Sequence, residues 1–421
     1  MTALAEQSAA WLENFTRQPR PEPWTQPLRE EAFGRFAQTG FPTTHDEEWR
    51  FTNVAPIARA TFDAAVPAPG GAGAAPAFTE GVRLIFVNGV ATGIPELPAG
   101  VSAGPLTEAA AQYMGQLCPT AQRNAFVDLN TAFFGAGLQL RIARGTVVQP
   151  PIHIVYITVD VARPAVTHPR TLVVAGAGAQ CNIVETHIHA GESAAAYFTN
   201  AVTEIVAANG AVVEYCKIQL EGSGAFHIGS VFAGLGRSAS FRSTAIDLGG
   251  ALVRNDVNVK LSEGSDAVLN GLYIVNGSQH VDNHTALDHA EPHGTSRELY
   301  KGILDGQARA VFNGRVLVRK DAQKTDSKQT NKNLVLSDNA VIDTKPELQI
   351  FADDVRCTHG ATIGQLDAES IFYLKSRGIG ASEARGLLTY AFAQDVVNLI
   401  KAEPVRAALE QVLPGKFNDR K

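Results

Sequence analysis

The stretch GAVVEYCKIQLEGSG, residues 210–224, contains the pattern that decides the fold. Apolar side chains recur in alternation from Val212 to Leu220, and glycines stand at positions 210, 222 and 224. Alternation with a period of two is typical of a β-strand, and glycine favours the turns between strands. The stretch therefore predicts one strand with a turn at each end.

The same pattern continues for about 210 residues from Leu138, with no helical periodicity between the strands. Regular strands separated by glycine turns are compatible with a sandwich, a barrel or a β-solenoid. A continuous all-β stretch of this length is long for one sandwich and natural for stacked coils, so we predict a solenoid. The alternating segments include residues 138–142, 202–206, 212–220, 257–261, 272–275 and 311–318.

Helical patterns flank this stretch on both sides. Before it we predict helices over 28–38, 106–117 and 121–134, and a hairpin that turns at Asn88 and Gly89. After it we predict a helix over 368–376, a second helix capped by Ser382, and a last helix opened by Pro404. The chain thus divides into a mixed α/β region over 1–135, a β core over 136–365 and a helical domain over 366–421.

Composition excludes several classes of function. The 421 residues carry a net charge of −6, which argues against a nucleic-acid binder, because phosphate affinity comes from clustered Lys and Arg. No run of 18 apolar residues predicts a membrane span, and the N-terminus MTALAEQSAAWLENF does not have the pattern of a secretory signal. We therefore expect a cytoplasmic protein. No G-x-x-x-x-G-K-[ST] motif occurs, so the chain should not hydrolyse ATP itself.

A candidate site lies in TKPELQIFADDVRCTHGATIGQ, residues 344–365. Cys357 and His359 are two positions apart, so in an extended segment both side chains point to the same side. Sulfur and nitrogen donors suit zinc or iron–sulfur centres, and this pair would form half of such a site. A buried cysteine beside a hydrogen-bonded histidine is the alternative. The other cysteines, at 118, 181 and 216, stand far apart and are expected to be free thiols.

A second cluster is the histidine run from His280 to His293, which also contains His284 and His289. Asp282 and Asp288 are interleaved, so a self-contained metal-dependent enzyme, such as a zinc hydrolase, is one hypothesis. The surroundings are predicted to be strand and turn, where a spacing of four does not bring these imidazoles together. The other hypothesis is therefore a polar surface of strand and turn residues. Residues 321–337, rich in Asn, Gln, Thr and Lys, are expected to form an internal hydrogen-bonded ladder, with a polar binding groove as the alternative.

Five long segments of the chain closely resemble the SufB/SufD family of the SUF iron–sulfur cluster assembly machinery. Of its two branches, SufD is favoured, because the additional cysteines that are typical of SufB are missing. In the segment EEWRFTN, residues 47–53, Trp49 and Phe51 are interpreted as anchors packed on a neighbouring element. The segments are EEWRFTN (47–53), LYKGILDGQARAVFNG (299–314), QKTDSKQTNKNLVLS (323–337), TKPELQIFADDVRCTHGATIGQLD (344–367) and FYLKSRGIGASEARGLLTYAF (372–392).

The resemblance implies a mainly β fold, a right-handed parallel β-helix, and a non-catalytic scaffold. The family's C-terminal helices bind SufC, an ABC-type ATPase, and Phe372, Tyr373, Leu387 and Tyr390 are our candidates for that contact. SufD pairs with SufB through the β-helix ends, so a SufB-like partner, or a second copy when the chain is isolated, is expected at that end.

The family motif ADDVxCxHGAT coincides with Ala352 to Thr362. It places His359 as a ligand, and Cys357 as a supporting thiol, of a nascent iron–sulfur cluster shared with the partner. No cofactor is expected to be tightly bound to the chain alone. The resemblance covers most of the chain and is weakest in its N-terminal third, apart from the DEEW segment.

Overall fold

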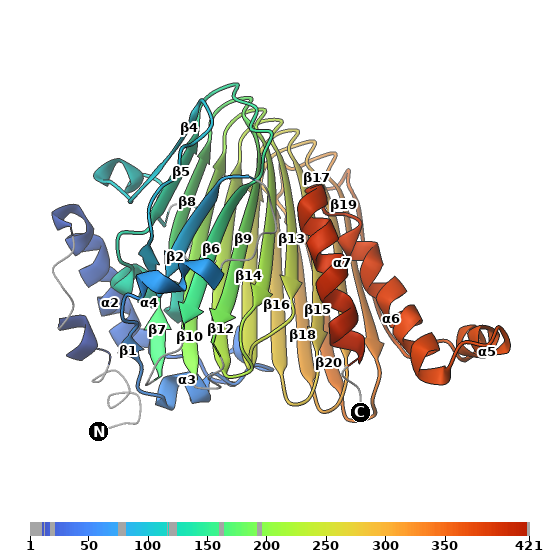
Figure 1. Cartoon of the computed structure of the whole chain (residues 1–421). Coiled ribbons are helices and arrows are strands. Elements are labelled where there is room, and N and C mark those ends of the chain that lie inside the picture. The colour runs from blue at the N-terminus through green and yellow to red at the C-terminus, as the bar shows by residue number, and fades with distance from the viewer. Residues whose placement is uncertain are drawn as a thin grey trace.

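The computed structural model is a β-solenoid with helices at both ends (Figure 1). It describes residues 11, 13–16, 22–74, 81–115, 117, 124–159, 164–191 and 196–418. Two long sheets form the walls of the solenoid, and successive strands along the chain alternate between them in about seven turns. The prediction of a mainly β solenoid with helical termini is therefore confirmed.

Three α-helices lie before the solenoid and three after it among the described residues. Their bounds are α2 (Gln26–Thr39), α3 (Ala55–Arg59), α4 (Ala125–Phe133), α5 (Ala368–Ser376), α6 (Ala381–Val397) and α7 (Glu403–Asn418). The 3-10 helices are η1 (Pro23–Thr25), η2 (Glu47–Trp49), η3 (Pro69–Ala74) and η4 (Glu108–Ala110).

The first sheet contains β20 (Val341–Ile350), β18 (Arg309–Val318), β16 (His280–His289), β14 (Leu252–Leu261), β12 (Ala225–Leu235), β10 (Tyr197–Ala207), β8 (Arg170–Ala175), β5 (Leu138–Ile142) and β4 (Val101–Gly104), with β7 (Ala165–Thr167) and β1 (Asp63–Ala64) beside them. The second sheet contains β21 (Arg356–Gly364), β19 (Asp326–Val335), β17 (Thr295–Leu304), β15 (Asp266–Val275), β13 (Ser240–Asp247), β11 (Val212–Leu220), β9 (Gln180–Ala190), β6 (Ile152–Val159), β2 (Arg83–Val87) and β3 (Val90–Ala91).

Neighbouring strands of the solenoid are parallel, and each residue pairs with one in the next coil. Phe226 pairs with Leu252, and Gln180 pairs with Val212, so the coils are not all of one length. Because paired residues in parallel strands point to the same face, one column of side chains lines the interior and the next faces outward. The register therefore decides which side chains from distant segments meet.

One corner of the solenoid is built from residues with a left-handed backbone, stacked coil upon coil. Gly210 has φ of 67°, and its N–H donates to the Arg237 carbonyl in the next coil. Ser238, His293 and Lys324 take the equivalent position with φ of 55°, 62° and 64°. Glycine adopts this conformation without strain, which explains why the predicted turns are glycine-rich.

Apolar side chains pack on both sides of the second sheet. Its inner face joins the central core of the solenoid, while outward residues such as Ile218, Leu272 and Ile303 pack against α6 and α7. The Lys301 Nζ anchors α6 by donating to the Phe392 carbonyl at 2.8 Å and to Asp395 at 2.7 Å. In Figure 1, α6 and α7 lie along the later strands, and α5 projects beyond them.

The two ends of the solenoid differ. Near the N-terminal end, β3 and β4 add antiparallel pairings to β2 and β5, and α2 and α4 pack in an aromatic cluster. At the other end, β20 and β21 each pair with one strand, and within the described residues no strand covers their outer edges. We call β20 and β21 the open end.

Three local predictions differ from the structure. Residues 106–117 do not form the predicted helix, since their described part contains only η4 and turns. Helix α6 begins at Ala381, so Ser382 lies inside the helix and Gly380 is its N-cap. Phe51 is exposed, whereas Trp49 is buried as predicted.

No helix in the described parts of the chain is long and apolar enough to cross a membrane.

Candidate functional site

The open end carries Cys357 and His359 on the inner face of β21. Cys357 pairs in register with Ser327, and His359 pairs with Gln329. Both partners are buried inside the solenoid, so Cys357 and His359 point the same way, toward the interior. His359 is nevertheless exposed, because no further coil covers β21 within the described chain. The two donors thus lie side by side on a surface that a partner can reach.

The Cys357 thiol is half-buried against the central core. Burial raises the pKa of Cys357, and Asp326 raises it further, while a hydrogen bond from the Ser327 backbone lowers it. The raised pKa keeps this sulfur protonated at neutral pH. A thiolate at this position therefore requires a bound metal or another base, because metal ligation needs the deprotonated form.

A layer of buried polar side chains lies directly below these two residues. We call Ser327, Gln329, Asn331 and Asn333 the inner layer; all four lie on the inner face of β19. Asn331 Nδ2 donates to the Tyr300 carbonyl at 3.2 Å, and Asn333 Nδ2 donates to Asn331 Oδ1. The stretch 321–337 thus forms an internal network, as expected, and not an open groove.

Glu298 is the site residue that sequence reasoning missed. It lies on β17 beneath Gln329, and its Oε2 accepts a hydrogen bond from Gln329 Nε2 at 2.7 Å. Burial raises the pKa of Glu298 to about 7, although hydrogen bonds to Thr285 and Gln329 act against this. The available signal was its place, two positions after Ser296 and two before Tyr300, on the face that alternation assigns to the interior.

The four histidines of the second predicted cluster do not come together. His280 and His284 face outward on β16, whereas His289 faces inward and contacts Ser296 through Nε2 at 2.9 Å. His293 occupies the left-handed corner position. Among the described residues, no group of three or more His, Cys, Asp and Glu side chains is placed to hold a metal ion.

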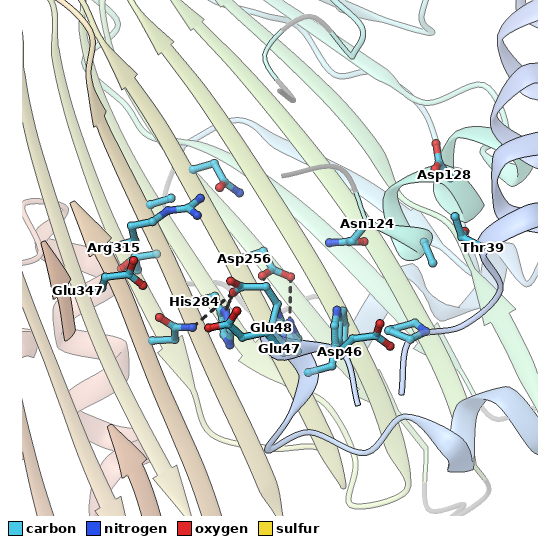
Figure 2. Close-up of a pocket in the computed structure, with 18 of the residues that line it drawn as sticks. Thr39, Asp46, Glu47, Glu48, Asn124, Asp128, Asp256, His284, Arg315 and Glu347 are labelled. Carbon is cyan, nitrogen blue, oxygen red and sulfur yellow. Dashed lines mark hydrogen bonds and ion pairs between the residues drawn. The ribbon is translucent and has the colours of Figure 1, made fainter. Parts of the chain in front are cut away.

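A pocket lies on the outer face of the first sheet (Figure 2). It has a volume of about 450 Å³. We call residues 46–52 the strap, and its first part, from Asp46 to Trp49, lines the pocket. The Glu48 carbonyl accepts from Arg254 at 2.6 Å, Glu47 accepts from Lys345 at 2.8 Å, and Thr52 donates to Asp282 at 2.6 Å. The strap thus ties β14, β16 and β20 together.

His284 lies between Asp282 and Glu48 at the centre of this contact, and Figure 2 shows it beside Glu48. Its Nε2 is 3.0 Å from Asp282 Oδ1, and its Nδ1 is 3.3 Å from Glu48 Oε2. Burial and Arg254 both lower the pKa of His284, but the two carboxylates outweigh them and the net shift is upward. The hydrogen bond between His284 and Glu48 is the main reason that the pKa of Glu48 is lowered.

The strap contact should therefore weaken as pH rises. A histidine whose pKa is raised on folding contributes its full stability below the unfolded value of about 6.5, and loses it as pH rises through the folded value. Glu48, with a lowered pKa, contributes above about 4.3 and loses its contribution in acid. We expect amide exchange of residues 47–52, corrected for intrinsic rates, to increase as the pH rises above about 6.5.

A His284→Gln variant provides the control for this measurement. It retains a polar side chain that cannot titrate, so the exchange of the strap should no longer depend on pH in this window. Equal pH dependence in the variant and the parent protein would contradict the role of His284.

Comparison with known proteins gives consistent matches. Residues 157–392 match the family model described as SUF system FeS cluster assembly, SufBD core domain. An iron–sulfur cluster assembly SufBD family protein of Synechocystis is 35% identical over 392 residues, which is 88% of this chain and 86% of that protein. The iron–sulfur cluster assembly protein SufD of Escherichia coli is 32% identical over 399 residues, 92% and 93% of the two chains. The chloroplastic protein ABCI7 of Arabidopsis thaliana is 27% identical over 398 residues, 90% and 84%.

Proposed function

The chain belongs to the SufBD family of iron–sulfur cluster assembly proteins and matches its SufD members over most of its length, and from this premise we propose that it is a scaffold subunit whose open end shares a nascent cluster with a partner. A role in iron–sulfur cluster assembly follows from the family. The scaffold role, the partners and the position of the cluster are our proposals.

One observation carries the proposal: Cys357 and His359 lie on the inner face of β21 at the open end, where no strand of the described chain covers them. Iron–sulfur clusters are commonly held by four protein ligands, and this chain offers two here. The remaining ligands would then come from the partner. The cluster is cargo that leaves for apo-proteins, so incomplete ligation by one subunit suits assembly and release.

The edges of β20 and β21 determine how the partner would attach. Each edge presents N–H and C=O groups that an added strand can pair, and the nearby Ile350, Phe351 and Ile363 side chains are exposed. We propose that a SufB-like chain continues the solenoid at this end. A second copy of this chain would use the same edges when it is isolated.

Helices α5 and α6 are proposed to bind a SufC-like ABC-type ATPase. Phe372, Tyr373 and Leu387 are 73%, 57% and 46% exposed, as the choice of these residues assumed. Tyr390 differs, because it packs partly buried against the α6–α7 cluster and is a weaker candidate. ATP-driven closure of two ATPase subunits would shift the open end if its two states bind the ATPase differently.

Replacing Phe372 and Tyr373 with aspartate should weaken binding of the ATPase subunit roughly thirtyfold or more, since an aromatic hot spot contributes about 2 kcal/mol or more. The measurement is titration of the purified ATPase subunit onto the full-length chain. Leu399→Asp is the matched control, because Leu399 is also exposed but lies beyond the end of α6. Equal binding of the double variant and the control would overturn this assignment.

The first test of the whole proposal is co-expression with SufB-like and SufC-like subunits. A stable complex that assembles clusters, beside an isolated chain without stoichiometric metal, is the expected result. The alternative, a self-contained metal-dependent enzyme at His280–His293, requires about one metal per chain that is lost on His284→Ala. Tight metal binding by the isolated chain at those histidines would replace the scaffold proposal.

A further inference from the structure

Three residues from successive coils form a column that ends at the open end. Glu298 on β17 pairs with Gln329 on β19, and Gln329 pairs with His359 on β21. All three point into the solenoid. Adjacent strands lie about 4.8 Å apart, so the buried Gln329 side chain is the one directly paired with His359 in the coil below.

Contacts on two sides hold the Gln329 amide. Its Nε2 donates to Glu298 Oε2 at 2.7 Å, and above the Glu298 pKa of about 7 the ionised carboxylate can only accept, so Oε1 then points elsewhere. Gly314 on the facing sheet leaves room for this amide, because a Cβ at that position would collide with Nε2. The orientation of Gln329 is therefore set by neighbours on both sheets.

The carbonyl oxygen of the Gln329 amide has no hydrogen-bond donor within the described residues. Gln329 is 1% exposed, so this oxygen is buried. A buried carbonyl oxygen without a donor is costly, typically about 1–3 kcal/mol, and calls for a specific explanation. The imidazole above it can supply the missing donor.

An imidazole that ligates a metal through one nitrogen carries its proton on the other, and that N–H is almost always bound by an acceptor. We propose that Gln329 is a positioning residue for His359: its Oε1 accepts the imidazole N–H and selects the tautomer that offers the remaining nitrogen to the cluster. Glu298 orients Gln329 from below. This inference rests on the proposed function of His359, but it can be tested without a cluster.

The test is the tautomer ratio of His359 in the full-length chain, labelled with ¹⁵N at histidine and recorded at about pH 8, where Glu298 is ionised. A His359→Asn spectrum identifies the signal among the 11 histidines. Gln329→Met keeps the side-chain length and removes the acceptor. Loss of one hydrogen bond should change the ratio about fivefold.

A matched control and a second variant complete the design. Asn331→Leu removes a buried amide from the same strand, but it is in register with Ala361, so it should leave the His359 ratio unchanged. Gly314→Ala should displace the Gln329 amide and shift the ratio in the same direction as Gln329→Met. If Gln329→Met leaves the ratio at the value of the control, the inference is wrong and Gln329 only fills the core.

Cluster assembly in the co-expressed complex separates this inference from the proposed function. If His359 is a ligand, Gln329→Met should lower the rate of cluster formation about 10- to 100-fold, as is usual for the outer partners of metal ligands. A shifted tautomer ratio with an unchanged rate would support the hydrogen bond and reject the role of His359. An unchanged ratio with a rate lost on His359→Ala would do the reverse.

Discussion

The His359→Ala variant should lose at least about tenfold in iron–sulfur cluster yield while its complex with the partner subunits persists. Removing even an outer partner of a metal ligand costs about 10- to 100-fold, and removing a ligand itself should cost no less. The complex should survive, because the partner would attach through the backbone edges of β20 and β21. The His359→Ala substitution leaves these N–H and C=O groups unchanged. Cys357→Ala should have a smaller effect, since the sulfur is half-buried and protonated at neutral pH.

The measurement is anaerobic reconstitution of the co-expressed complex, with cluster yield read from its visible absorption and from bound iron. His45→Ala is the matched control, because His45 is an exposed histidine that lies outside β20 and β21. A His359→Ala complex that forms clusters like the His45→Ala complex would reduce Cys357 and His359 to core residues. The subunit would then be purely architectural.

Replacing Arg254 with methionine should cost about 3–5 kcal/mol of folding stability, the usual effect of removing one partner of a buried ion pair. The Arg254 side chain is 2% exposed. It donates to Asp256 at 3.1 and 2.9 Å, to Asp282 at 2.8 Å and to the Glu48 carbonyl at 2.6 Å, and it lies 3.7 Å over the Trp49 ring. Methionine fills part of the volume but leaves buried carboxylates without their cation.

Arg319→Met is the matched control for this loss. Arg319 also forms two hydrogen bonds with one carboxylate, at 2.9 and 2.7 Å to Asp288, but its side chain is 51% exposed. The Asp288 side chain is 10% exposed, but the half-exposed Arg319 guanidinium is largely hydrated, so this variant should lose clearly less stability than Arg254→Met. Chemical denaturation gives both values, and amide exchange over residues 47–52 reports release of the strap. Similar losses in the two variants would contradict the central role of Arg254.

Local patterns were sufficient for the elements of this protein. The alternation from Leu138 onward and the glycines at the turns determine coils, because strand periodicity and left-handed corners are properties of a few consecutive residues. The pairing of Cys357 with His359 on one face follows from the same period of two. Two local predictions failed although propensity favoured them: the described part of 106–117 is mostly turns despite its Ala, Glu and Gln residues, and α6 begins at Ala381, one residue before Ser382.

Only the tertiary structure decided which of these faces meet. Glu298 lies under Gln329, and the Glu48 carbonyl contacts Arg254 from a distant part of the chain, because the corners set a coil length that varies along the solenoid. A change of one residue in any corner would turn the following strand over and exchange its inner and outer side chains. The sequence by itself therefore determined the coils and the family, whereas the register between coils decided the layer beneath His359, the dispersal of the four histidines and the strap across the first sheet.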